Sequence, residues 1–196
     1  NINIEPIAGH STVSLIADDV PGVYKNNPKQ LSVRAIPYIE FKPMKGLSIK
    51  SILGVSINSN RTGIFESDKS YMNLVGSGSQ KKTAQYNTSL GYGYTWNNIA
   101  NYQFQINSDH NFILTGITEW NDSRNESSYA YNEGFDYDEF IYYNLAAGNN
   151  PQTSTSFSQT KKMSYAARLN YSYKGRYLLT VSNRWDGASQ LVDKWD

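Results

Sequence analysis

The stretch Met163 to Gly187, MSYAARLNYSYKGRYLLTVSNRWDG, decides the fold that we expect for this chain. Apolar and polar side chains alternate in both of its arms, which is the period-2 pattern of a β-strand with one apolar face. The apolar positions are Ala167, Leu169, Tyr171, Tyr173, Tyr177, Leu179, Val181 and Trp185. Lys174-Gly175 separates the arms, and glycine there permits the positive φ angle of a tight turn. The stretch therefore predicts one complete β-hairpin.

Three tyrosines, Tyr171, Tyr173 and Tyr177, gather at the turn end of the apolar face. In a soluble β-sandwich this face would be mainly Val, Ile and Leu, and each buried tyrosine hydroxyl would need its own partner. In an outer-membrane barrel the same face meets lipid, and Tyr and Trp are enriched at the level of the headgroups. Because the second environment accounts for more of the residues, we interpret the hairpin as part of a transmembrane β-barrel.

The longest alternation runs from residue 83 to residue 106, with Tyr86, Tyr94 and Trp96 on the even face. About 20 residues of alternation exceed the usual soluble strand of about 3 to 10. This length fits a barrel strand that crosses the bilayer in about 9 to 11 residues and projects beyond it. Pro37 predicts an irregularity in the first strand. Strands are predicted at 31–43, 46–59, 83–106, 111–121, 157–173 and 176–190.

Short predicted turns alternate with long predicted loops, which is the asymmetry of outer-membrane barrels. The turns are 44–46, 107–110 and 174–175, and the loops are 1–30, 60–82 and 121–157. About six strands cannot enclose a pore, since even small outer-membrane barrels have about 8. We therefore expect an all-β, antiparallel transmembrane β-barrel segment of a larger barrel, with long extracellular loops and short periplasmic turns.

Composition excludes several functions. The 18 basic and 17 acidic residues give a net charge of +1, and without a basic stripe we expect no nucleic-acid binding. The absence of cysteine excludes disulfides and thiolate metal sites. His10 and His110 have no neighbouring histidine that would complete a metal site. No catalytic constellation is present, so we expect no enzyme, no metal site and no cofactor.

Three stretches resemble SusC/RagA-type TonB-dependent outer-membrane transporters. Residues 171–189, YSYKGRYLLTVSNRWDGAS, are similar to a family hairpin written "YK-x-RYLL" and then "R-x-DGSS", with Ala188 where serine is more usual. Residues 38–55 resemble "YLEYKPIKGLSFKSNLGV", and residues 135–148 resemble "PYDSFLFYNLG". The three occur in the family's order, and the resemblance extends from about Asn27 to the end.

The resemblance implies import of large nutrients, oligosaccharides or peptides, across the outer membrane of a Gram-negative bacterium. It also implies contact with outer-membrane lipid, a SusD-like surface lipoprotein that covers the barrel, and the TonB complex, which acts on an N-terminal plug. Neither a plug nor a TonB box is visible in the sequence. We expect residues 1–196 to belong to the barrel domain and to carry no transport alone.

Aromatic and acidic side chains are concentrated in the predicted loop 121–157. Aromatic rings can stack on sugars or peptide groups, and tyrosine also hydrogen-bonds, while the lumen wall of a barrel is polar. Candidate ligand-binding residues are Phe135, Asp136, Tyr137, Asp138, Phe140, Tyr142 and Tyr143 in the loop, and Asn97, Asn101, Arg168 and Arg184 on the wall. The alternative is that the loop aromatics pack against neighbours or a partner, because long loops need an apolar cluster to become ordered.

Two other functions remain open from the residues alone. One is an autonomous β-domain, rich in Asn and Tyr, that binds carbohydrate outside the cell, and the other is a passive porin wall. A soluble binding module should tolerate charge on one exposed sheet face, whereas a lipid-facing strand should not. The acidic residues of the loop lack the ordered spacing of a known calcium loop.

Overall fold

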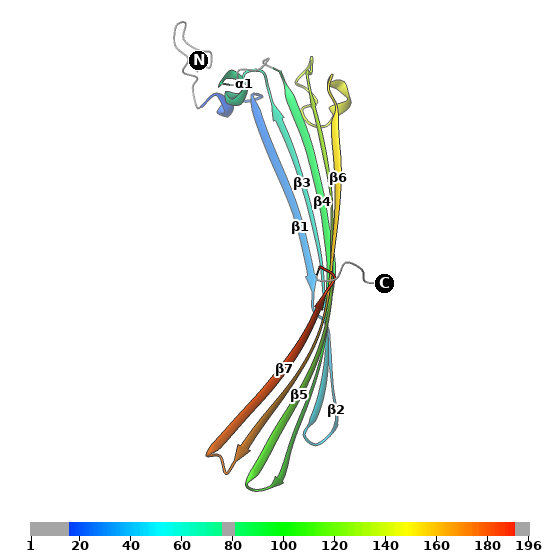
Figure 1. Cartoon of the computed structure of the whole chain (residues 1–196). Coiled ribbons are helices and arrows are strands. Elements are labelled where there is room, and N and C mark those ends of the chain that lie inside the picture. The colour runs from blue at the N-terminus through cyan, green and yellow to red at the C-terminus, as the bar shows by residue number, and fades with distance from the viewer. Residues whose placement is uncertain (1–15, 76–80, 191–196) are drawn as a thin grey trace. The chain divides into compact units, whose positions relative to one another are not determined.

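The computed structural model describes residues 16–75 and 81–190. The earliest part of the predicted loop 1–30, including His10, lies outside these residues. The elements are short 3-10 helices at Ala17–Asp19 and Leu145–Ala147, helix α1 at Tyr71–Val75, and strands β1 (Tyr24–Ala35), β2 (Tyr38–Met44), β3 (Leu47–Glu66), β4 (Thr83–Asn107), β5 (His110–Glu133), β6 (Gln152–Tyr173) and β7 (Tyr177–Ala188) (Figure 1).

All seven strands pair in one antiparallel sheet. The order of the strands is β1-β3-β4-β5-β6-β7, and β2 also pairs with β3. From β2 onward consecutive strands are therefore neighbours, as the short predicted turns require, whereas β1 and β2 follow each other in the chain and both pair with β3. The sheet confirms the predicted all-β, antiparallel barrel segment. No helix among the described residues is long and apolar enough to cross a membrane.

The chain divides into two compact units. Unit 1 contains residues 1–31, 58–90 and 126–157, and unit 2 contains residues 32–57, 91–125 and 158–196. Strands β3 to β6 contribute residues to both units. The three short turns belong to unit 2, and the long connections belong to unit 1.

The strands of unit 1 are longer than the sequence predicted. β1 begins at Tyr24 inside the predicted loop 1–30, and β3 continues to Glu66 inside the predicted loop 60–82. β5 reaches Glu133 and β6 begins at Gln152, so the loop predicted at 121–157 contains only residues 134–151. The predicted bounds of all three loops were wrong because the strand ends carry polar residues on both faces, which removes the apolar period.

Cross-strand hydrogen bonds between small polar side chains accompany the backbone ladder in unit 1. Thr88 Oγ1 lies 2.6 Å from Ser128 Oγ, and Ser127 Oγ lies 2.7 Å from Ser156 Oγ. Such pairs stabilise a sheet by about 0.2–1 kcal/mol each. A strand can therefore continue there without an apolar face.

The β6–β7 hairpin has the predicted geometry. Tyr173 pairs with Tyr177, Leu169 with Val181, and Tyr165 with Trp185. Lys174 and Gly175 have φ angles of 51° and 64°, which are the positive angles that a tight hairpin turn requires at its central residues. The apolar positions of both arms consequently lie on one face.

The strand predicted at 31–43 is interrupted at Pro37. β1 ends at Ala35 and β2 begins at Tyr38, because proline has no N–H to contribute to a ladder. The Pro37 carbonyl still accepts a hydrogen bond of 3.0 Å from the Leu53 N–H. The predicted irregularity is therefore confirmed, since β1 and β2 both pair with β3 and β2 resumes this pairing at Tyr38.

The buried core lies in unit 1, where loop 134–151 packs on the sheet. Its buried apolar residues are Phe65, Ala84, Phe135 and Tyr142, with Tyr86, Ile141 and Leu145 packed against them. Because Ala84 and Tyr86 occupy even positions of β4, the loop covers the even face of that strand. The opposite face of β4 in unit 1 carries Thr83, Gln85, Asn87 and Ser89.

Gly63 of β3 provides the space that Tyr142 occupies. A Cβ atom at Gly63 would lie 2.4 Å from two atoms of the Tyr142 ring. Gly63→Ala is therefore expected to displace the ring and to destabilise unit 1 by about 1–3 kcal/mol, the usual cost of overpacking. Gly116→Ala in β5 is the control, since no atom lies within 4 Å of its Cβ position. Denaturant titration of both variants in the complete protein measures the difference.

Candidate functional site

Aromatic side chains form two clusters on the apolar face of unit 2. The first cluster, here the turn-side belt, contains Tyr102, Phe104, Phe112, Tyr171, Tyr173 and Tyr177. Its rings contact one another from strand to strand, with Phe104 and Phe112 stacked at 5.0 Å and 10°. His110 stacks on Tyr171, and its Nδ1 lies 2.7 Å from the Tyr171 hydroxyl. The sequence placed His110 in a turn but did not indicate this contact.

The second cluster, here the mid-strand belt, contains Trp96, Trp120, Tyr165 and Trp185. Trp96 and Trp120 lie 5.1 Å apart, Trp120 meets Tyr165 edge-on at 6.3 Å, and Tyr165 pairs with Trp185 across the hairpin. The indole N–H of Trp96 donates to Ser51 Oγ at 2.8 Å. A polar tip with a partner and an apolar ring is the usual arrangement of Trp at a membrane interface.

The two belts keep a constant separation along four strands. Each mid-strand residue lies eight positions from a turn-side residue, in the pairs Trp96–Phe104, Trp120–Phe112, Tyr165–Tyr173 and Trp185–Tyr177. Eight residues span about 27 Å along a strand, or roughly 19–22 Å across a membrane at the usual tilt of about 35–45°. Aromatic girdles of outer-membrane barrels flank an apolar band of about 25 Å.

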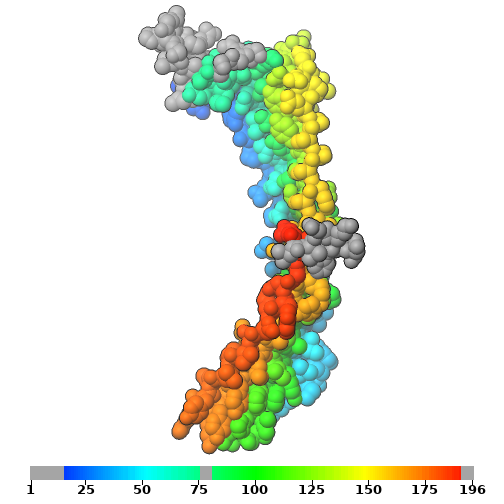
Figure 2. All heavy atoms as spheres, in the orientation of Figure 1, coloured from blue at the N-terminus to red at the C-terminus, as the bar shows by residue number. Residues whose placement is uncertain are grey.

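Most side chains between the belts are apolar and uncovered by other parts of the described chain, and the polar exceptions, Asn98, Thr118 and Asn183, lie next to the mid-strand belt. Leu53, Leu114, Leu179 and Val181 are 41%, 43%, 54% and 54% exposed. β7, orange to red in Figure 2, lies at the surface of unit 2. A contiguous exposed apolar face of this kind marks an interaction surface, and the flanking aromatic belts match lipid as its partner.

The four wall residues predicted as ligand contacts occupy the opposite face of unit 2. Asn101 accepts a hydrogen bond of 2.8 Å from Thr115 Oγ1. Arg184 Nε donates to Asp186 Oδ1 at 2.8 Å, and Arg184 Nη2 donates to Ser164 Oγ at 3.1 Å. Arg168 is exposed opposite Ser182. Asn101 and Arg184 thus have partners within the sheet.

Asn97 differs from the other three because it lines a groove of about 330 Å³. Arg34 and Asn121 also line this groove, which passes over Gly54 and Gly93. Asn97 Oδ1 is buried and has no hydrogen-bond partner among the described residues. Among the four wall candidates, Asn97 is therefore the residue that lines a groove and has a buried acceptor without a partner among the described residues.

The loop candidates in unit 1 separate into buried and exposed side chains. Phe135 and Tyr142 belong to the buried core, and the Tyr142 hydroxyl accepts a hydrogen bond of 2.7 Å from Asn27 Nδ2. Asp138 forms a 2.6 Å ion pair with Lys82. The remaining exposed candidates are Asp136, Tyr137, Phe140 and Tyr143. Phe135 and Tyr142 therefore pack the loop against the sheet, which is the alternative role that the sequence left open. Ligand binding by the loop stays a prediction.

Ile141 adopts a φ angle of 42°, which is unusual for a β-branched residue. The Tyr143 N–H donates to the Phe140 carbonyl at 2.8 Å, and the Ile141 N–H donates to the Asp138 carbonyl at 3.2 Å. This tight turn directs Tyr142 into the core and leaves Phe140 and Tyr143 exposed. A strained backbone of this kind costs about 1–3 kcal/mol, which burial of Tyr142 offsets.

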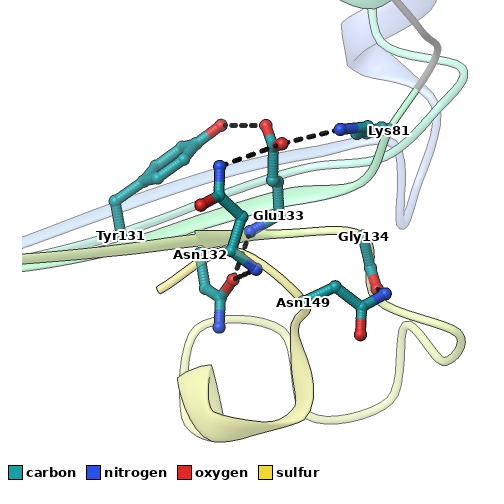
Figure 3. A network of polar contacts seen from close by, with 7 residues as sticks. Lys81, Tyr131, Asn132, Glu133, Gly134 and Asn149 are labelled. Carbon is teal, nitrogen blue, oxygen red and sulfur yellow. Dashed lines mark hydrogen bonds and ion pairs between the residues drawn. The ribbon is translucent and has the colours of Figure 1, made fainter. Parts of the chain in front are cut away.

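A polar network fixes both ends of loop 134–151 to β5 (Figure 3). Buried Asn132 donates through Nδ2 to the Leu145 carbonyl at 2.7 Å, and its Oδ1 accepts from the Asn150 N–H at 2.7 Å. Asn149 Nδ2 donates to the Gly134 carbonyl at 2.8 Å. Asn132 thus joins the loop to the end of β5, and Asn149 joins the two ends of the loop to each other, so the loop is closed at its base.

Glu133 collects three donors at the edge of this network. Lys81 Nζ lies 2.7 Å away, the Tyr131 hydroxyl 3.1 Å and Asn150 Nδ2 3.3 Å. The hydrogen bond from Lys81, followed by those from Asn150 and Tyr131, lowers the pKa of Glu133 below its ordinary 4.5. Burial, followed by the hydrogen bond to Glu133, raises the pKa of Tyr131 to about 12.

The sequence of the chain is similar to those of TonB-dependent receptors. No family model matches the chain. TonB-dependent receptor P3 of Formosa agariphila is 27% identical over 193 residues, which are 93% of this chain and 18% of that receptor. TonB-dependent receptor SusC of Bacteroides thetaiotaomicron is 31% identical over 104 residues, which are 53% of this chain and 10% of SusC. A solved structure titled "Structure of the RagAB peptide transporter" superposes with a TM-score of 0.80 at 18% identity, covering 95% of this chain and 20% of that one.

The chain is similar to part of the barrel of SusC/RagA-type TonB-dependent receptors. It spans about a fifth or less of the length of these relatives. The resemblance found in the sequence is thus confirmed, as is the prediction that the strands form a portion of a barrel sheet. The relatives are named as receptors and transporters, not as enzymes.

The low pKa of Glu133 predicts how loop 134–151 responds to acid. The folded state binds the Glu133 proton less tightly than the unfolded state, so the carboxylate stabilises the loop fully above the ordinary pKa of 4.5. This contribution is lost as the pH falls through the lower, folded-state pKa. Hydrogen exchange of residues 134–151, measured from about pH 7 to about pH 3, is expected to accelerate in that window. Glu133→Gln should lack this pH-dependent acceleration of exchange. If the variant showed the same pH dependence as the wild type, Glu133 would not be the group that stabilises the loop.

Sequence reasoning missed a polar groove in unit 1, on the face of the sheet opposite to loop 134–151. Tyr129 and Tyr131 stack there with an interplanar angle of 5° and ring centres 6.5 Å apart. Tyr129, Asn60 and Asn87 line a groove of about 280 Å³. The alternation of Tyr129, Tyr131 and Glu133 was the available signal, but these residues were assigned to a loop.

Proposed function

We propose that this chain is wall and outer-loop structure of an outer-membrane importer of large nutrients. The observation that carries the proposal is the apolar face of unit 2, bounded by two aromatic belts eight residues apart on four successive strands. Such a face requires lipid or another apolar partner. The similarity to TonB-dependent receptors supports lipid.

The open edges of the sheet support a larger barrel. β1 and β7 stand at the ends of the strand order, so each has one edge without a neighbour among the described residues. Unpaired strand edges do not occur in the hydrocarbon region of a membrane. Seven strands are also fewer than the 8 or so of small outer-membrane barrels. Further strands must therefore complete the wall, and we expect a plug and a TonB contact outside residues 1–196.

The relatives suggest the partner and the cargo. The chain is similar to SusC and to a protein of the RagAB peptide transporter. We propose by analogy a SusD-like surface lipoprotein as partner, the TonB complex as the source of energy, and oligosaccharides or peptides as cargo. Loop 134–151, with exposed Tyr137, Phe140 and Tyr143, is available for contact with either the partner or the cargo.

The test is to purify the complete native polypeptide from the outer-membrane fraction through an affinity tag. We expect an intact mass several-fold above the 22.1 kDa of this chain, a co-purifying lipoprotein, and cargo uptake that stops when the proton gradient is dissipated. Uptake that survives loss of the gradient would identify a passive porin. A soluble protein of 22.1 kDa would favour the autonomous carbohydrate-binding domain and end the import proposal.

A further inference from the structure

The groove in unit 1 is lined entirely by hydroxyl and amide side chains. All eleven residues that line its roughly 280 Å³ are Ser, Thr, Asn or Tyr, contributed by β3, β4, β5 and β6. Asn60, Asn87, Ser89, Ser127, Tyr129 and Ser156 line it from one face of the sheet. That face is opposite to the one covered by loop 134–151, because Asn87 alternates with Ala84 and Tyr86.

The absence of charge among these eleven residues limits the ligand chemistry. A sulfate, phosphate or carboxylate group would be recognised by Arg or Lys, and none lines this groove. An apolar side chain of a peptide would need an apolar pocket, and the lining has no aliphatic residue. Hydroxyl and amide groups both donate and accept hydrogen bonds. This capacity matches a neutral ligand rich in hydroxyl groups.

Asn87 has an acceptor that the protein leaves unused. Its Oδ1 is buried and has no hydrogen-bond partner among the described residues. A buried acceptor without a partner is unfavourable, and a ligand hydroxyl would satisfy it. Neighbouring groups are already arranged in fixed positions, with Asn60 Nδ2 donating to Ser89 Oγ at 3.2 Å and Ser127 Oγ lying 2.7 Å from Ser156 Oγ.

Tyr129 adds an aromatic surface to the groove. Its ring is 36% exposed and stacks in parallel on Tyr131. The Tyr131 hydroxyl donates to Glu133 Oε2 at 3.1 Å, and Lys81 holds Glu133 in turn at 2.7 Å. This chain of contacts positions the Tyr129 ring before any ligand arrives. A fixed aromatic ring can pack against the apolar face of a sugar while hydroxyl groups bind at its edges.

From this arrangement we infer that the groove binds a neutral oligosaccharide. The inference rests on the proposed function and deepens it, since it assigns the cargo to uncharged glycans and excludes peptides and anionic glycans from this site. Tyr129 provides the packing surface, Asn87 accepts a sugar hydroxyl, and Asn60 and the serines bind further hydroxyls. The exposed aromatics of loop 134–151 lie on the other face and do not contribute to this site.

The experiment measures binding by calorimetry to the complete receptor purified in detergent. The probes are the hexasaccharides of maltose, cellulose, xylan, mannan and laminarin type, hexagalacturonate, and an uncharged decapeptide. We expect at least one neutral hexasaccharide to bind, and Tyr129→Ala and Asn87→Leu each to weaken that binding by at least about tenfold. Met72→Ala in helix α1, at a residue that is 65% exposed and lines no groove described above, is the control and should leave the affinity unchanged.

Three results would overturn the inference: no neutral hexasaccharide binds, neutral glycan binding is insensitive to both groove substitutions, or only the peptide or hexagalacturonate responds to them. Circular dichroism of each variant verifies that the sheet is retained. The proposed import function is tested by separate measurements, namely the location of the protein in the outer membrane and the co-purification of a lipoprotein. A receptor that keeps both but fails the glycan test would refute the groove assignment alone.

Discussion

Val181→Arg is expected to impair assembly of the complete protein in the outer membrane. Val181 lies midway between Tyr177 of the turn-side belt and Trp185 of the mid-strand belt, on the apolar face of β7. Arginine at the midplane of a lipid-facing strand costs about 2–4 kcal/mol, and this cost falls to about 0–1 kcal/mol near the interfaces. Because folded domains are stable by only about 5–15 kcal/mol, the loss should be visible as a lower urea midpoint and less folded protein in the membrane.

Two leucines of the same strand supply the controls for this prediction. Leu179→Arg, on the same face but closer to Tyr177, should have a smaller effect than Val181→Arg. Leu178 is adjacent, but it pairs with Ser172 on the opposite, polar face and is 78% exposed. Leu178→Arg should therefore be tolerated. Equal effects at Leu178 and Leu179 would contradict the lipid-facing assignment, whatever the result at Val181.

Local pattern was sufficient to predict the sheet of unit 2. Alternation placed Leu169, Val181 and Trp185 on one face, and the pairing of β6 with β7 confirms that placement. Lys174-Gly175 predicted the turn, and both residues have the positive φ angles that it needs. The faces of these strands can be predicted from the sequence because a barrel strand between lipid and water carries apolar and polar side chains at alternate positions.

The same reasoning failed in unit 1, where the strand ends carry polar residues on both faces. Ser127, Ser128 and Tyr129 were assigned to a loop, although they belong to β5. With no apolar face there is no period to detect, and the backbone ladder with its Ser and Thr side-chain pairs defines the strand. The polar groove was missed for this reason, since it exists only when four such strands lie side by side.

The sequence also could not predict which aromatic residues of the loop are buried and which are exposed. Tyr142 and Tyr143 are adjacent and identical in type, yet Tyr142 is buried and Tyr143 is 61% exposed. The difference arises from Phe65, Gly63 and Asn27, which are about 80 to 115 positions earlier in the chain. Only the tertiary contact decides which tyrosine anchors the loop.

Tyr142→Ala should accordingly release loop 134–151 from the sheet. The substitution removes an aromatic ring that packs with Phe65 and Phe135 over Gly63, and it leaves Asn27 without its 2.7 Å hydrogen-bond acceptor. Removal of a buried aromatic side chain costs about 3–5 kcal/mol. Limited proteolysis of intact cells is expected to cut the variant within residues 134–151, while the membrane part of the receptor stays folded.

The neighbouring Tyr143→Ala is the matched control and should leave the loop resistant to protease, because its exposed ring contributes little burial. Tyr142→Phe keeps the ring and removes only the hydroxyl, so it should cost about 1 kcal/mol, the usual worth of one hydrogen bond. The order expected for protection of the loop is wild type and Tyr143→Ala first, Tyr142→Phe next and Tyr142→Ala last. Equal cleavage of the two alanine variants would mean that the loop is held by its polar ends at Asn132 and Asn149 alone, without help from the aromatic core.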